Sequence, residues 1–367
     1  MQQAEKPNNL MTILDKAILG RALSCEEIGF LLSLDAEEDL ERLFAAAGTV
    51  RSRWFGKTVF LYGFLYFNTA CSNNCLFCQY RKSNSKATRY SKSTEMIDTI
   101  VRKMEASGVH LIDLTMGEFA DGTKEAESEY GRLSSFIQKI RKESDIPIMV
   151  SPGVVNRSVL ADLAEAGADW YACYQETYAR PLFAKVRPGQ NFDTRYGAKL
   201  TAREKGMHLE EGMLIGLGES LEDRANTIIG MRELDADQVR VMSLVAHPDT
   251  PMADMAPTPE IEELKVIAVM RLVMPDRLIP ASLDVGGLAG LKRRLEAGAN
   301  VVTSMIIPGM GLSGVANQEL DIEDARRTPE AIAPILRECG LTPASADEFR
   351  PWLAARNHTR TGGRSGL

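Results

Sequence analysis

From about residue 57 onward, apolar residues recur along the chain in two alternating patterns. Short runs rich in Val, Ile, Leu and aromatic residues predict β-strands, and longer amphipathic segments between them predict α-helices. The strands are expected near 59–67, 110–116, 147–151, 169–174, 212–216, 238–244, 277–283 and 300–306. The helices are expected near 94–107, 131–144, 157–167, 193–206, 220–234, 259–273 and 286–297. Eight strands alternating with helices favour an α/β fold, a (βα)8 TIM barrel, over a doubly wound open sheet.

A different pattern precedes the first strand. The first nine residues are polar and are predicted to be unstructured, and two helices are expected to follow them. Ser24 with Glu27, and Asp35 with Glu38, have the spacing of a capping box at a helix N-terminus. We therefore expect these helices to form an entry layer to the barrel.

The patterns also predict how the chain is divided. We expect an N-terminal helical extension over 1–56 and the barrel over 57–310. A helical segment over 311–355 is expected to close on the barrel as a C-terminal cap. The last residues, 356–367, are rich in Arg and Gly and are predicted to be a disordered tail.

Composition limits the classes of partner. A chain of 367 residues, 44% of them hydrophobic, can bury the core of one large domain or two small ones. The net charge of −7 argues against nucleic acid or an anionic membrane as partner, because both attract clustered Lys and Arg. The longest apolar stretch, 59–67, is too short to cross a bilayer, and no secretion or transit signal is visible. We therefore expect a cytoplasmic protein.

Three of the six cysteines, Cys71, Cys75 and Cys78, lie within eight residues, directly after the first predicted strand. Their spacing suggests a loop whose thiolates converge on one metal centre, which we interpret as an iron–sulfur cluster. Such clusters normally take four thiolates, so a trio leaves one iron open to another ligand. A structural zinc site is the alternative, but it needs two pairs of ligands, and the next histidine, His110, lies 32 residues beyond Cys78.

The C-x3-C-x2-C spacing, with Phe77 before the last cysteine, resembles the signature of the radical S-adenosylmethionine (SAM) superfamily. Five further passages resemble its 3-methylornithine synthase family, and the similarity runs from about residue 12 to residue 350. These passages are 62–67, 113–118, 174–178, 239–242 and 279–284.

This resemblance implies that SAM binds the open iron and is cleaved to a 5′-deoxyadenosyl radical. It implies that the radical isomerises L-lysine to 3-methylornithine by carbon–carbon fragmentation and recombination, the first step of pyrrolysine biosynthesis. It also implies an external electron donor of the flavodoxin or ferredoxin type. Side chains would bind and orient the reactants rather than act as catalytic acids or bases.

The resemblance further implies a set of SAM-binding residues. The strand end formed by Met116, Gly117 and Glu118 is similar to the superfamily's glycine–glutamate strand end. Arg195 has an alternative interpretation, since an Arg on an amphipathic helix is usually only solvated. The predicted SAM-binding residues are Phe77, Thr115, Met116, Gly117, Glu118, Glu176, Arg195 and Gly216.

A lysine substrate carries two ammonium groups and one carboxylate, so a dry pocket needs two carboxylates and a guanidinium. Asp113, Asp284 and Arg240 supply that set, and each lies at a predicted strand end, where TIM barrels place their active sites. The alternative is an internal salt bridge between Arg240 and one aspartate. The predicted substrate-binding residues are Asp113, Arg240, Ser282, Asp284, Thr303 and Ser304.

Several other features bear on the choice of family. Cys25, Cys173 and Cys339 are scattered, and we interpret them as small buried hydrophobes rather than ligands of a second cluster. Gln79 follows the last cysteine, where the family would have an aromatic residue. Two alternatives stay open: a radical SAM enzyme of the biotin synthase and hydrogenase-maturase group that acts on another small substrate, and a non-catalytic binding module that a metal stabilises.

Overall fold

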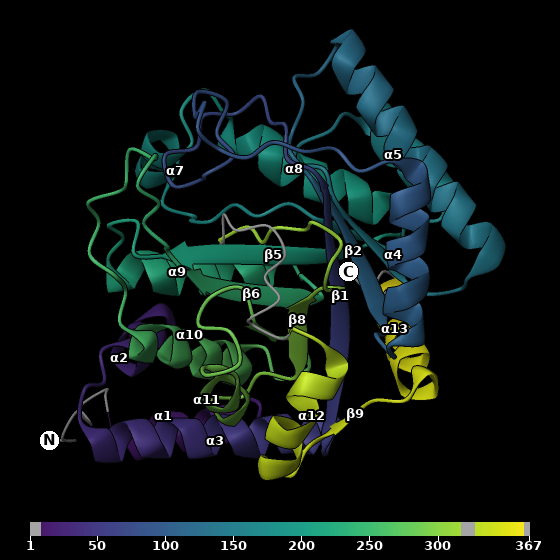
Figure 1. The fold of residues 1–367 in the computed structure, drawn as a ribbon. Coiled ribbons are helices and arrows are strands. Elements are labelled where there is room, and N and C mark those ends of the chain that lie inside the picture. The colour runs from purple at the N-terminus through teal and green to yellow at the C-terminus, as the bar shows by residue number, and fades with distance from the viewer. Residues whose placement is uncertain (1–8, 317–326, 363–367) are drawn as a thin grey trace, which may run out of the picture.

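A computed structural model of the chain describes residues 9–316 and 327–362 (Figure 1). Eight parallel strands lie side by side in the order β6-β5-β4-β3-β2-β1-β8-β7. They are β1 (Thr58–Asn68), β2 (Leu111–Met116), β3 (Ile148–Ser151), β4 (Trp170–Ala172), β5 (His208–Ile215), β6 (Gln238–Ser243), β7 (Pro280–Ser282) and β8 (Val301–Met305). This alternation of strands and helices confirms the predicted (βα)8 barrel.

The last seam of the barrel, between β6 and β7, is joined only near its start. The amide of Val239 donates to Leu278 O (2.9 Å), and the amide of Leu278 donates to Asp237 O (3.1 Å). No further pairing joins these two strands in the described part of the chain. The barrel is therefore closed by hydrogen bonds at the amino-terminal end of this seam and is looser towards its carboxyl end.

Helices cover the outside of the sheet. Most begin at a side-chain cap, for example Ser93 before α4 and Ser220 before α9. α4 buries Ile97, Ile100 and Met104, which share one helical face. The covering helices are α4 (Thr94–Ala106), α5 (Lys124–Glu143), α6 (Arg157–Ala166), α7 (Arg180–Val186), α8 (Phe192–Glu204), α9 (Leu221–Glu233), α10 (Glu260–Val273) and α11 (Leu291–Glu296).

Some element boundaries differ from the sequence prediction. β5 begins at His208, four residues before the predicted start. Glu210 and Glu211 interrupt the apolar run in the sequence, which is why the start was missed. In the structure both carboxylates are fully buried in ion pairs, which allows them to lie within the strand. α7 was not predicted, and α11 begins at Leu291 rather than near 286.

Among the described helices, none combines the length and the apolar character needed to cross a membrane.

The N-terminal layer contains three helices rather than the predicted two: α1 (Leu10–Ile18), α2 (Cys25–Leu32) and α3 (Glu37–Phe55). The capping box of Ser24 and Glu27 is confirmed. The second capping box is wrong, because Ala36 is the N-cap of α3 and makes no side-chain cap. α2 packs on α9, and α3 packs on α10 (Figure 1). These helices cover one flank of the barrel.

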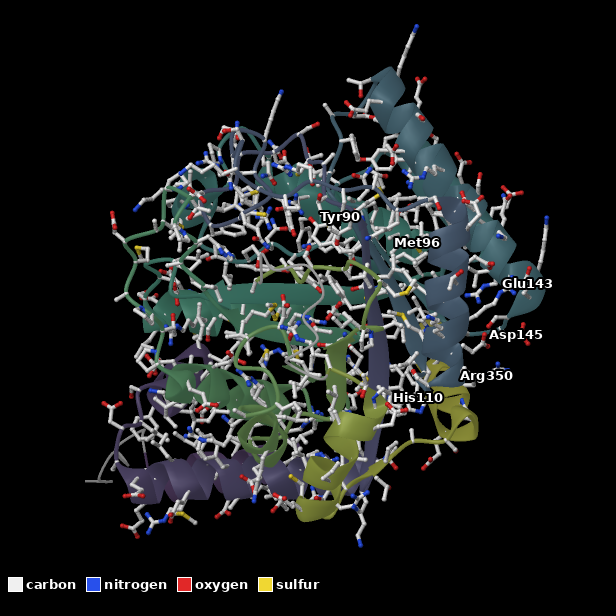
Figure 2. The ribbon with its side chains drawn as sticks, in the orientation of Figure 1. Tyr90, Met96, His110, Glu143, Asp145 and Arg350 are labelled. Carbon is white, nitrogen blue, oxygen red and sulfur yellow. The ribbon has the colours of Figure 1, made fainter. Side chains whose placement is uncertain are left out.

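The C-terminal segment covers the amino-terminal end of the barrel. It contains α12 (Pro329–Glu338), β9 (Thr342–Pro343), which pairs with the start of β1, and α13 (Ala346–Gly362). Phe349 packs on Phe60, with ring centroids 5.0 Å apart. His110 lies beside this segment (Figure 2), where its Nδ1 accepts from the Leu61 amide and its Nε2 donates to Ala344 O, both at 2.8 Å.

α13 ends at Gly362, so the described part of the predicted tail, residues 356–362, is helical. Arg356 Nε donates to Asp237 Oδ1 at 3.0 Å, and this buried acid tethers the helix to the barrel. Residues 363–367 lie outside the described residues, as do 1–8 and 317–326. The division into an extension, a barrel, a cap and a tail otherwise stays a prediction.

Candidate active site

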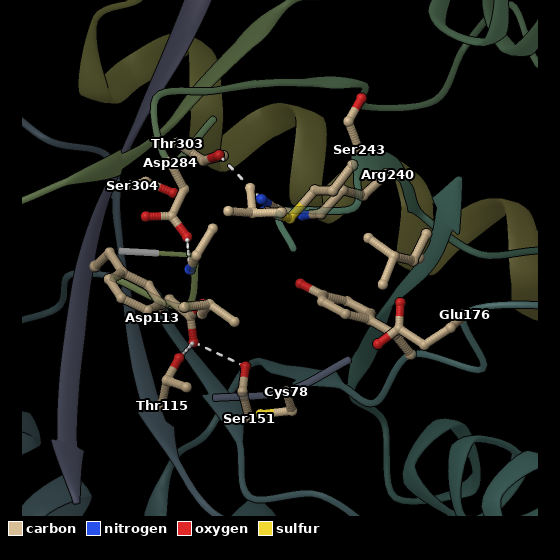
Figure 3. A pocket seen from close by; sticks show the side chains of 18 of the residues that line it. Cys78, Asp113, Thr115, Ser151, Glu176, Arg240, Ser243, Asp284, Thr303 and Ser304 are labelled. Carbon is tan, nitrogen blue, oxygen red and sulfur yellow. Dashed lines mark hydrogen bonds between the residues drawn. The ribbon is translucent and has the colours of Figure 1, made fainter. Parts of the chain in front are cut away.

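A cavity lies inside the barrel at the carboxyl ends of the strands (Figure 3). Its wall combines residues from the cysteine loop with residues from most of the strands. Of the residues predicted from the sequence, those that line it are Phe77, Cys78, Asp113, Thr115, Glu176, Arg240, Asp284, Thr303 and Ser304. Ser151, Tyr174, Ser243 and His247 also line it, and these were not predicted as site residues.

The cysteine loop is tied to the end of β2. The amide of Ser72 donates to Glu118 O (2.7 Å), and the amide of Gly117 donates to Asn68 O (3.0 Å). A Cβ at Gly117 would lie 1.9 Å from Ala70 O, so only glycine fits there. The absence of a side chain at Gly117 therefore lets the end of β2 lie directly against the cysteine loop.

The loop offers three thiols, and a 4Fe–4S cluster with one open iron takes three thiolates. Cys75 Sγ accepts hydrogen bonds from Gln190 Nε2 (3.0 Å) and Arg187 Nη1 (3.4 Å), the kind of contact that supports a metal-bound sulfur. Burial, with Cys75 and Cys71 nearby, raises the pKa of Cys78 to about 12. Binding of iron must therefore displace protons. Within the described residues, no three His, Cys, Asp or Glu side chains converge on a single ion.

Two buried ion pairs stand beside the cysteine loop. Arg195 Nη2 lies 2.6 Å from Glu118 Oε2, and it also donates to Gln190 Oε1 at 2.8 Å. Arg187 Nη2 lies 2.7 Å from Glu176 Oε1. Arg195 is only 3% exposed, so the alternative of a merely solvated Arg is wrong. Sequence reasoning missed Arg187 and Gln190, which lie in the connection between two helices.

Backbone strain marks two cavity residues. Glu176 and Ser304 have φ angles of 66° and 65°, in the left-handed region that residues other than glycine rarely adopt. Such positions cost of order 1–3 kcal/mol each and persist where the surroundings hold them, often at functional sites. The strain therefore agrees with a functional role for both residues.

Not every predicted residue reaches the cavity. Gly216 donates its amide to Glu219 Oε1 (2.9 Å), and the space beside it is filled by Thr258. Cys173 is buried as predicted, but it is more than a hydrophobe, because its Sγ accepts a hydrogen bond from Arg195 Nη1 at 3.0 Å. Predicted residues that lie outside the cavity wall are Cys71, Cys75, Met116, Gly117, Glu118, Arg195, Gly216 and Ser282.

Asp113 projects from β2 into the cavity. Its Oδ1 accepts hydrogen bonds from Thr115 Oγ1 (3.0 Å) and Ser151 Oγ (2.9 Å) (Figure 3). Burial, followed by the charge of Glu210, raises the pKa of Asp113 to about 7. Asp113 has no ion pair within 4 Å among the described side chains. It is therefore poised to ionise when a cation approaches.

Asp284 also lines the cavity and is held by three groups. Arg327 Nη1 lies 2.8 Å from Oδ1, and the amide of Ala316 donates to Oδ2 at 2.8 Å. The amide of Asp284 donates to Ser282 Oγ at 3.2 Å, so Ser282 supports Asp284 from behind. Sequence reasoning missed Arg327, which lies 43 residues along the chain.

Arg240 lines the cavity from β6 and donates through Nη1 to Thr303 Oγ1 at 3.1 Å. It forms an internal salt bridge at 2.7 Å, but the partner is Glu210, not an aspartate. The alternative of a salt bridge was thus right about pairing and wrong about the partner.

Gln79, in place of an aromatic residue, donates to Val315 O at 3.0 Å and holds that cavity residue.

Comparisons with known proteins fit this geometry. The family model of the radical SAM superfamily matches residues 65–228. The 3-methylornithine synthases of Methanosarcina acetivorans and Methanosarcina barkeri are each 40% identical over 339 residues, which is 92% of this chain and 95% of each relative. The chain belongs to the 3-methylornithine synthase family. The [FeFe] hydrogenase maturase subunit HydE of Thermotoga maritima is 30% identical over 78% of this chain and 79% of its own length.

Solved structures agree. A crystal structure of methylornithine synthase has a TM-score of 0.87 and 39% sequence identity, covering 93% of this chain and 99% of that one. The hydrogenase maturase HydG from Carboxydothermus hydrogenoformans has a TM-score of 0.79 at 24% identity, which shows a shared barrel fold.

Membership in the 3-methylornithine synthase family makes this chain a radical SAM enzyme and implies a 4Fe–4S cluster and SAM as cofactors. The predictions of the family, the fold and the cofactors are therefore confirmed. The assignment of individual residues to cluster, SAM and substrate stays a prediction.

Proposed function

We propose that this enzyme isomerises L-lysine to 3-methylornithine by carbon–carbon fragmentation and recombination, as the first step of pyrrolysine biosynthesis. The observation that carries the proposal is the wall of the cavity, which places Cys78 together with Asp113, Arg240 and Asp284 around one space. Two carboxylates and a guanidinium complement two ammonium groups and one carboxylate.

On this proposal, Cys71, Cys75 and Cys78 hold the cluster, and the open iron takes SAM. When bound, the two cofactors supply a radical that removes a hydrogen atom from the substrate. Arg195 would bind the SAM carboxylate, and Glu118 and Glu176 would hold its ammonium end. The buried pairs with Arg195 and Arg187 support these roles, because they fix both carboxylates in orientation.

The remaining residues would act on the substrate. Asp113 and Asp284 would bind its two ammonium groups, and Arg240 would bind its carboxylate. A substrate held at both ends keeps its fragments together, so that they recombine with each other rather than with water. Thr303 supports this role, since its hydroxyl accepts from Arg240 and helps to fix the guanidinium.

The alternatives are less well supported. The hydrogenase maturase subunit is less similar than the 3-methylornithine synthases, at 30% against 40% identity, and over a smaller share of the chain. Membership in an enzyme family argues against a non-catalytic binding module.

We further propose a flavodoxin or ferredoxin as electron donor and a cytoplasmic location, where the cysteines stay reduced.

The test is anaerobic incubation of reconstituted protein with SAM, a reductant and L-lysine. The expected products are 5′-deoxyadenosine and an isomer with the mass of lysine that co-migrates with 3-methylornithine. A Cys71→Ala variant is the control and should form neither product. If the wild type forms 5′-deoxyadenosine but leaves lysine unchanged, the substrate assignment is wrong and the maturase-like alternative gains support.

A further inference from the structure

Beneath the cavity, Glu210 of β5 is a carboxylate that is completely removed from solvent. Its Oε1 accepts from Arg240 Nε (2.7 Å) and Gln238 Nε2 (2.6 Å). Its Oε2 accepts from the hydroxyl of Tyr174 (2.8 Å). A buried charge is costly unless it is paired and hydrogen-bonded, and this carboxylate has partners on both oxygens. Glu210 is therefore held rigidly.

The same contacts decide which part of Arg240 is left for a ligand. Its Nε is taken by Glu210, one donor on Nη1 is taken by Thr303, and the guanidinium carbon lies 5.8 Å from the ring centre of Tyr174. Nη2 has no hydrogen-bond partner among the described residues, and Arg240 is one of the side chains that surround the cavity (Figure 3). What remains is the end of the guanidinium formed by Nη1 and Nη2.

We infer that Glu210 is a positioning residue for substrate recognition: it fixes the guanidinium of Arg240 so that the Nη1 and Nη2 end receives the substrate carboxylate. The inference rests on the proposed function. A planar guanidinium grips a carboxylate with two parallel hydrogen bonds only when its plane is held. Glu210 holds that plane from the side that faces away from the substrate, without touching the substrate.

Charge supports the same role. Arg240 and Glu210 neutralise each other, as do Arg327 and Asp284, so the buried pairs add no net charge to the cavity. Without Glu210, Arg240 would be an unbalanced buried cation, free to turn towards Asp113 and occupy the carboxylate meant for an ammonium. Glu210 thus keeps Arg240 and Asp113 available for different ends of the substrate.

The test is a double-mutant cycle on the reconstituted holoenzyme with SAM bound, measuring the dissociation constant of L-lysine anaerobically. Glu210→Gln should weaken lysine binding by about tenfold or more in the wild-type background. In the Arg240→Lys background, which has already lost the two-pronged grip, the same change should weaken binding by less than about threefold. SAM affinity should stay within about twofold of wild type, since the hydrogen bonds of Glu210 among the described residues go to Arg240, Gln238 and Tyr174 and not to the cysteine loop.

Glu211→Gln is the matched control, because it removes an equally buried, ion-paired acid from the same strand but on the opposite face. It should lower stability and leave lysine affinity unchanged. Should Glu210→Gln not fold, Glu210→Asp withdraws the carboxylate while keeping its charge, and it should show the same selective loss of lysine affinity.

Two results would overturn the inference: normal lysine affinity in the Glu210 variant, or an equal loss in both backgrounds, which would indicate a merely structural role. A wild-type holoenzyme that does not bind lysine at all would instead refute the proposed function. The two failures are therefore distinguishable.

Discussion

Glu118 at the end of β2 and Arg195 on α8 form a buried ion pair, with 2.6 Å between Oε2 and Nη2, although 77 residues separate them in the chain. Both residues were predicted to bind SAM. Glu118 follows β2, the strand whose end is hydrogen-bonded to the cysteine loop, and Arg195 lies on α8. The ion pair therefore joins the end of β2 to α8. It therefore couples the orientation of both predicted SAM contacts.

Arg195→Lys is expected to weaken SAM binding by about tenfold or more, because an ammonium cannot serve Glu118, Gln190 and a ligand carboxylate as a guanidinium can. Calorimetric titration of reconstituted protein with SAM measures the effect. Arg157→Lys, which changes a largely exposed Arg in an ion pair with Glu204, is the control and should bind SAM normally. Normal SAM affinity in the Arg195 variant would remove this residue from the SAM site.

Replacing Cys71, Cys75 or Cys78 with Ala is expected to abolish the stable cluster and all cleavage of SAM while the barrel stays folded. Iron content, absorbance and 5′-deoxyadenosine formation report the loss. Cys25→Ala and Cys339→Ala should keep the cluster and cost only modest stability, since both thiols are merely part-buried. A Cys71→Ala protein that still cleaves SAM would contradict the cluster assignment.

Asp284→Asn is expected to cost roughly 2–5 kcal/mol of lysine binding, because an ammonium in a desolvated pocket loses its counter-charge. The change also leaves Arg327 without its anion, so the melting temperature should fall. Cluster content and SAM affinity should be retained. The control Asp193→Asn removes an exposed carboxylate that pairs with Arg180 and should leave lysine affinity unchanged. Normal lysine binding by the Asp284 variant would exclude this residue from the substrate site.

Lysine affinity is expected to rise with pH near neutrality. Asp113 has a pKa of about 7 in the folded protein, so it becomes a carboxylate, the form that pairs with an ammonium, as the pH passes from 6 to 8. Titrations with lysine across this range measure the effect. In Asp113→Asn the rise should disappear, and binding should be weak throughout. A wild-type affinity that does not change with pH would refute this role.

The same group affects stability with a definite sign. Because its pKa is raised from 3.8 to about 7, the folded state binds this proton more tightly than the unfolded state. Its contribution to the free energy of unfolding is therefore complete below the ordinary pKa and is lost as the pH rises through 7. Urea denaturation at several pH values should show that Asp113→Asn flattens this part of the wild-type dependence.

Phe349→Ala should destabilise the protein by about 3–5 kcal/mol, because Phe349 is 1% exposed and packs on Phe60 and Tyr62. Denaturation with urea measures the loss. The control Trp54→Ala removes a larger ring that is 54% exposed, and it should change stability far less. Equal effects of the two changes would show that α13 does not close the barrel in the way described.

The sequence by itself determined the features that depend on local spacing. The cysteine trio is fixed by the distance between ligands along the chain, and the barrel follows from strands and helices that alternate with their own hydrophobic periods. Asp113, Arg240 and Asp284 could be found because a charge at the end of an apolar run is conspicuous. Family resemblance then added the expected roles.

Only the tertiary structure decided which charges face each other. Arg240 pairs with Glu210, Asp284 with Arg327, and Glu118 with Arg195, across 30, 43 and 77 residues of chain. No local pattern encodes such pairs, because they form between elements that meet only when the barrel closes. Glu210 could not be predicted for the same reason. Its charge interrupts the apolar pattern, so the start of β5 was missed. A carboxylate inside a barrel is tolerated only when polar groups surround it, as Arg240, Gln238 and Tyr174 do here.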